Sequence, residues 1–94
     1  MKKEVTIEMM RELLLASKPW NCSKADFRNY LETLSDEQLK ETDICKELNF
    51  TSLDLYDLAM RLETEIGYQL GYGYYEIADA SNITVGKVIN ICNN

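Results

Sequence analysis

The sequence predicts a small all-α domain, a helical bundle with three to four main helices, from three observations. Apolar residues recur at intervals of three and four in several segments, which places them on one face of a helix. The chain contains only four glycines and one proline, so architectures built from strands and tight turns are not expected. The apolar share of 46% is enough for one modest core, and residues 1–94 are therefore expected to form a single domain.

The first helix is expected from about Thr6 to Ala16. Four apolar residues at helical spacing can share one buried face of this helix: Ile7, Met10, Leu13 and Leu14. Pro19 is expected to stop the helix, because a proline disfavours helical backbone angles in the residue before it.

Two capping-box sequences predict additional helical material around residues 23–41. The segment Ser23–Asp26 has the form Ser-x-x-Asp, and the apolar residues that follow it at helical intervals are Phe27, Tyr30, Leu31 and Leu34. The segment Ser35–Gln38 has the same form with Gln in the fourth place, and it is expected to open a short helix through Leu39. A simple turn is the alternative for each box, because the motif is short.

The strongest helix pattern runs from about Ser52 to Ile66 and follows a long loop. The loop covers Thr42 to Phe50, and its expected anchors in the core are Ile44, Leu48 and Phe50. Thr51–Asp54 is a third capping box at the start of the helix. Gly67 is expected to end the helix, because glycine readily adopts the left-handed conformation found there.

The C-terminal third begins with a stretch rich in tyrosine and glycine, Tyr68–Tyr75, which lacks periodicity and is expected to form a loop. Its aromatic side chains either pack over the open end of the bundle or contact a ligand or partner. A short helix is expected around Glu76–Ala80. Thr84 is expected to cap a last helix, whose inward residues are Val85, Val88, Ile89 and Cys92.

Charge and hydropathy argue against several classes of function. Ten basic residues against sixteen acidic ones give a formal net charge of -6, which disfavours binding to nucleic acid or to an anionic membrane. The acidity favours protein partners with basic patches, although it also serves solubility alone. No apolar run reaches membrane-spanning length and no signal peptide is visible, so a cytoplasmic protein, with monomer as the default state, is expected.

Catalysis and metal binding are not expected. The chain has no histidine, which removes the commonest general base and the commonest neutral metal ligand. The three cysteines, Cys22, Cys45 and Cys92, are far apart and form no Cys-x-x-Cys motif, so neither a disulfide framework nor a zinc site is expected. A small enzyme that uses carboxylates or a cysteine is the least favoured hypothesis.

The helix from Ser52 to Ile66 has two apolar faces. At about 100° per residue, one continuous stripe forms the expected core face: Leu55, Leu58, Ala59, Leu62 and Ile66. The opposite side collects Leu53, Tyr56, Asp57, Met60 and Thr64, with Glu63 at its edge. This second face is either a docking face, with apolar contacts and steering charges, or a solvated surface with scattered apolar residues.

Ser52 is expected at the N-terminal end of this helix. Free backbone N–H groups and the positive end of the helix dipole favour a phosphate at such a position. The alternative is that Ser52 or Thr51 serves only as an N-cap, which is the commoner role of a serine at a helix start.

These residues resemble the acyl carrier protein family, including the peptidyl and aryl carrier domains. The family motif Leu-Gly-x-Asp-Ser-Leu-(Asp) is matched by the segment Leu48–Asp54, which reads Leu-Asn-Phe-Thr-Ser-Leu-Asp. Met60–Ile66 matches the family's pattern Val/Met-x-x-Leu-Glu-x-x-Phe/Ile. Ile83–Ile89 resembles the start of the family's last helix, at about the right distance from the serine. The resemblance covers about half of the chain, from Asp43 to Ile91.

The resemblance implies a carrier function. Ser52 would carry a covalent 4′-phosphopantetheine arm, delivered from coenzyme A by a phosphopantetheinyl transferase with magnesium, and would thus be a phosphoprotein site. The thiol of the arm would hold acyl or aminoacyl groups as thioesters for acyl-transferring or condensing enzymes of lipid or secondary-metabolite biosynthesis. The partner-docking positions of the family fall on five residues of this chain: Leu53, Tyr56, Asp57, Met60 and Glu63.

The chain departs from the family pattern at three places. Thr51 replaces the aspartate that helps the modifying enzyme recognise its target, so an unmodified, carrier-like interaction module is the alternative function. Asn49 replaces the family's glycine, and asparagine tolerates unusual backbone angles better than most residues. The material from Ser23 to Leu39 lengthens the N-terminal region, as in a specialised carrier of a dedicated biosynthetic cluster.

Overall fold

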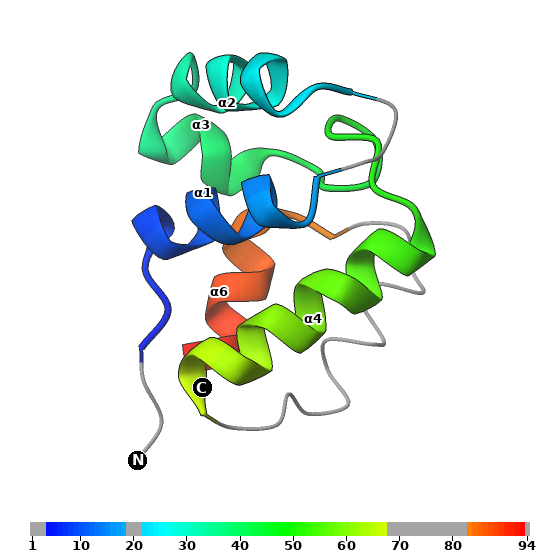
Figure 1. The fold of residues 1–94 in the computed structure, drawn as a ribbon. Coiled ribbons are helices and arrows are strands. Elements are labelled where there is room, and N and C mark those ends of the chain that lie inside the picture. The colour runs from blue at the N-terminus through cyan, green and yellow to red at the C-terminus, as the bar shows by residue number, and fades with distance from the viewer. Residues whose placement is uncertain (1–3, 19–21, 68–82, 94) are drawn as a thin grey trace.

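The computed structural model describes residues 4–18, 22–67 and 83–93, and these residues form a small all-α bundle, as predicted (Figure 1). Five helices lie in the described ranges: α1 (Ile7–Ala16), α2 (Lys24–Glu32), α3 (Asp36–Glu41), α4 (Ser52–Ile66) and α6 (Val85–Asn93). The short helices α2 and α3 are the additional helical material predicted around residues 23–41. The predicted loop Tyr68–Tyr75 and helix Glu76–Ala80 lie outside the described residues.

The predicted capping residues begin the helices. Thr6 accepts a hydrogen bond from the Met9 N–H at the start of α1, and Ser23 accepts one from Asp26 N–H at the start of α2. Ser35 and Gln38 form a full capping box at α3, which extends to Glu41, two residues beyond the predicted Leu39. These local bonds satisfy N–H groups that have no partner inside a helix, which explains why the helices begin where they do.

Helix α1 lies between the α2–α3 pair on one side and α4 on the other, and it also contacts α6 (Figure 1). The side chains between these helices form one buried core, to which every described helix contributes. Met10 and Leu14 of α1 are buried as predicted, whereas Ile7 and Leu13 are only partly buried, because they lie at the edges of the α1 core face. Ile89 of α6 is likewise partly buried, while Val85, Val88 and Cys92 are buried.

Helices α3 and α6 approach each other closely at Gly86. A Cβ atom at this position would lie 3.1 Å from the carbonyl oxygen of Lys40, which is closer than side chains normally pack. A side chain at this position in the first turn of α6 would require the backbone at Lys40 to shift by a few tenths of an ångström. None of the helices in the described ranges is long and apolar enough to cross a bilayer.

The two ends of the described chain are joined by the side chain of Asn93. The Val5 N–H donates to Asn93 Oδ1 at 2.8 Å, and Asn93 Nδ2 donates to the Val5 carbonyl at 3.0 Å. Val5 is buried, so water does not readily replace these bonds. The pair ties the segment before α1 to the last turn of α6.

Replacing Asn93 with alanine is expected to lower the free energy of unfolding by about 2 kcal/mol, because both polar groups of the buried Val5 backbone lose their partner. Urea unfolding followed by circular dichroism measures this change. Asn90→Ala is the matched control, since Asn90 is exposed on the same helix, and it should change stability by less than about 0.5 kcal/mol. Equal effects of the two substitutions would show that the Asn93 bonds do not stabilise the fold.

Candidate functional site

Ser52 is the first residue of α4, and its side chain is exposed. The residue before it, Thr51, is the N-cap: Thr51 Oγ1 accepts from the Asp54 N–H at 3.3 Å. Asp54 Oδ2 in turn accepts from the Thr51 N–H at 2.9 Å and from the Thr51 hydroxyl at 3.0 Å. Thr51 therefore caps the helix, and the Ser52 hydroxyl takes no part in the capping bonds.

The backbone at this helix start can accept an anion. Within the described part of the chain, the N–H groups of Ser52 and Leu53 have no hydrogen-bond acceptor, whereas the N–H groups of Asp54 and Leu55 are bonded to Thr51. Free N–H groups and the helix dipole favour a phosphate here. The Asp54 carboxylate opposes this effect, although its Oδ2 is already bonded to the N–H and the hydroxyl of Thr51.

The loop before α4 is anchored in the core. Its three predicted anchors are all buried in the core: Ile44, Leu48 and Phe50. The Ile44 N–H donates to the Ile83 carbonyl at 2.8 Å, and the Val85 N–H donates to the Thr42 carbonyl at 3.1 Å, so the loop is bonded to the segment before α6. Asn49 adopts a positive φ of 61°, which asparagine tolerates, and turns the chain toward Thr51.

A row of exposed apolar side chains follows Ser52 along α4. Leu53, Tyr56 and Met60 are 79%, 49% and 66% exposed, and their spacing places them on one side of the helix. The opposite side is buried as predicted, through Leu55, Leu58, Ala59, Leu62 and Ile66. We call the exposed row together with Asp57 and Glu63 the α4 face.

The two acidic residues of the α4 face differ in their surroundings. Asp57 Oδ2 accepts from Arg61 Nε at 3.0 Å, an i, i+4 ion pair on the helix surface, so its charge is partly neutralised. Glu63 is partly buried at the edge of the face. The structure thus brings Leu53, Tyr56 and Met60 together, with Asp57 beside them and Glu63 to one side.

Sequence reasoning missed one residue at this face, Leu13 of α1. A shallow groove of about 350 Å³ runs between α1 and α4, and Leu13 and Met60 line it together with Arg61 and Thr64. The helical pattern of residues 6–16 assigned Leu13 to the core, because spacing alone does not distinguish the edge of a buried face from its centre. The groove gives the α4 face a depression that can receive an apolar side chain.

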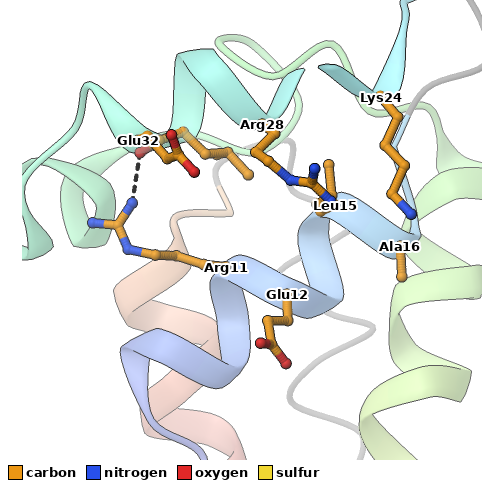
Figure 2. Close-up of a pocket in the computed structure, with 8 residues that line it drawn as sticks. Arg11, Glu12, Leu15, Ala16, Lys24, Arg28 and Glu32 are labelled. Atoms are coloured by element: carbon orange, nitrogen blue, oxygen red, sulfur yellow. Dashed lines mark hydrogen bonds between the residues drawn. The ribbon is translucent and has the colours of Figure 1, made fainter. Parts of the chain in front are cut away.

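A larger groove of about 410 Å³ lies between α1 and α2 (Figure 2). Arg11 lines it but is already bonded, since its guanidinium donates to the Leu31 carbonyl at the end of α2. The other charged side chains around the groove are of both signs, with Lys24 and Arg28 against Glu12 and Glu32. Their charges cancel, so this groove does not select an anion or a cation.

Metal ligands do not cluster in the described residues, and the thiol of Cys45 is not activated. No group of three or more Cys, Asp or Glu side chains in these residues could hold a metal ion. Burial, with a smaller effect of the neighbouring Asp43 carboxylate, raises the pKa of the Cys45 thiol above its usual value. Cys45 is therefore protonated at neutral pH and is a poor nucleophile.

Comparison of the sequence with protein-family models and with curated proteins found no match, and no solved structure matches the fold. The candidate site consists of an exposed serine at a helix start, free N–H groups beside it and an exposed apolar face with acidic residues.

Proposed function

We propose that this chain is a cytoplasmic acyl carrier protein. In this proposal Ser52 carries 4′-phosphopantetheine, and acyl or aminoacyl groups are held on its thiol as thioesters for acyl-transferring or condensing enzymes. The chain itself is not an enzyme in this proposal. The observation that carries the proposal is the exposed Ser52 hydroxyl in the first turn of α4, where capping is performed by Thr51 instead.

The surroundings of Ser52 fit a phosphodiester. The phosphate oxygens can accept from the free N–H groups of Ser52 and Leu53. A basic side chain is therefore not required to bind the phosphate. The serine oxygen would bond to phosphorus as the pyrophosphate of coenzyme A is cleaved, adenosine bisphosphate would leave, and the hydroxyl proton would pass to the transferase or to water. The arm, once attached, supplies a thiol that forms thioesters, and the chain supplies position and recognition.

The α4 face supports partner docking beside the arm. Leu53, Tyr56 and Met60 give a partner apolar contacts, and flexible methionine adapts to different surfaces. The acidic balance of the chain favours partners with basic patches, because opposite charges speed and orient the encounter. A transferase and an acyl-transferring enzyme can use this face in turn, since it extends along the helix from Ser52.

Incubation with coenzyme A, magnesium and a promiscuous phosphopantetheinyl transferase is expected to add the mass of one arm to the protein. Ser52→Ala is expected to abolish this addition completely, because no hydroxyl remains at the start of α4. Intact-mass spectrometry measures both. Ser23→Ala is the control, since Ser23 also lies at a helix start but caps α2 itself, and this variant should load normally. Absence of loading with several transferases would refute the carrier function.

Thr51 supports a second candidate, an unmodified interaction module with a carrier-like fold. The aspartate that the resemblance leads one to expect before the serine is absent, and Thr51 is fully used in the capping box. In that case the α4 face binds a partner while Ser52 stays unmodified. Intact mass of the protein from its native host separates the two functions, since only the carrier gains an arm.

A further inference from the structure

A groove of about 320 Å³ lies between α2 and the loop that leads to Ser52, and no residue of the α4 face lines it. Phe27 and Leu48, both buried, give it an apolar floor, and the Phe27 ring packs at 6.2 Å from the ring of Phe50. Tyr30 lines it from α2 and is 44% exposed, so its ring and hydroxyl are available to a ligand. The groove is open to solvent, and its volume suits a small ligand.

The charged side chains that line this groove are all acidic. Asp26 contributes a carboxylate from the first turn of α2, and Glu47 contributes one from the loop. Glu47 is held in place, because its Oε2 accepts from the Asp43 N–H at 2.8 Å. Lys18 approaches the nearby chain and donates to the Cys22 carbonyl at 2.9 Å, but it does not line the groove. A ligand with an ammonium group therefore complements the groove, and an anion does not.

The groove lies within reach of Ser52. Asn49 lines it and precedes Ser52 by three residues, so the two Cα atoms are at most about 11 Å apart. The chain of phosphopantetheine from phosphate to thiol is longer than this span. An arm on Ser52 that turns back past Asn49, instead of running along α4, brings its thiol end to the groove.

We infer that this groove binds the group carried on the arm, and that this group is a small aminoacyl. This inference rests on the proposed carrier function and narrows its cargo. The apolar floor at Phe27 and Leu48 contacts the methylene groups of the arm and the side chain of the aminoacyl group. The ammonium faces the carboxylates of Asp26 and Glu47. A fatty acyl group of the same size lacks that pairing with the carboxylates.

The test compares two cargoes of equal shape, alanyl and isobutyryl, which differ by an ammonium in place of a methyl group. A promiscuous transferase loads each onto the full chain from an amide-linked coenzyme A analogue, which does not hydrolyse. NMR then measures the backbone amide shifts relative to the apo protein. We expect the shift changes at Asp26, Tyr30 and Glu47 to be at least about threefold larger for alanyl than for isobutyryl.

A paired substitution tests whether the two carboxylates cause the difference between the cargoes. Asp26→Asn with Glu47→Gln is expected to remove the difference between the cargoes, whereas Glu41→Gln, an exposed residue of α3 outside the groove, should preserve it. Equal shift changes for both cargoes, or changes confined to the first turn of α4, would overturn the inference. Loading is scored separately by intact mass, so a failure of the carrier function itself is recognised by the absence of added mass.

Discussion

Replacing Met60 with lysine is expected to raise the KM of a phosphopantetheinyl transferase for this protein by at least about tenfold, with little change in kcat. Met60 is 66% exposed at the centre of the α4 face, so the substitution removes an apolar contact and places a positive charge against a basic partner. The chemistry at Ser52 lies two turns away and is not altered. Initial rates of loading at varied carrier concentration, followed by intact mass, give KM and kcat separately.

Two controls make this prediction specific to the α4 face. Ala25→Lys introduces the same charge at an exposed position on α2, and it should leave KM within about twofold of the original value. Met60→Leu keeps the apolar contact and should load normally. Thermal unfolding of all three variants should be unchanged, because none of these side chains is buried. An unchanged KM for Met60→Lys would show that the transferase docks elsewhere.

The helices could be predicted from the sequence because their signals are local. Thr6, Ser23, Ser35 and Thr51 each accept a bond from an N–H group three residues later, and such a bond depends only on nearby residues. Gly67 ends α4 with a φ of 68°, the left-handed conformation that glycine adopts without strain. The core face of α4 followed from its spacing for the same reason.

The surroundings of the site could be predicted only in part. The spacing in α4 placed Leu53, Tyr56 and Met60 on the side opposite the core, and they are exposed there. The groove beside Met60 was not predictable, because Leu13 reaches it from another helix and the packing of α1 on α4 depends on the whole core. The ion pair of Asp57 with Arg61 could have been predicted, because the two residues are four positions apart on a helix. This pair reduces the negative charge that the α4 face presents to a partner.

The bonds that join one helix to another could not be predicted from spacing at all. Arg11 is the clearest case, because its partners lie 20 to 25 residues away in the chain. Its guanidinium donates to the Leu31 carbonyl at 2.5 Å and to the Leu34 carbonyl at 2.7 Å, and it pairs with Asp36 at 3.2 Å. One side chain of α1 thus holds the end of α2 and the start of α3 together.

Replacing Arg11 with methionine is expected to lower the free energy of unfolding by about 3 kcal/mol, which corresponds to roughly 15 °C in Tm for a domain of this size. Methionine keeps the aliphatic packing, so the loss reports the two bonds to the carbonyls of Leu31 and Leu34, while the exposed pair with Asp36 adds little. Urea and thermal unfolding measure the change.

The matched control is Arg28→Met on the facing helix, because Arg28 is exposed and bonded to no group in the described ranges. It should change stability by less than about 0.5 kcal/mol. Arg11→Lys should recover only part of the loss, since a single ammonium cannot reach both carbonyls with the geometry of a planar guanidinium. If Arg11→Met and Arg28→Met were equally stable, the α1–α2–α3 junction would be held by apolar contacts alone.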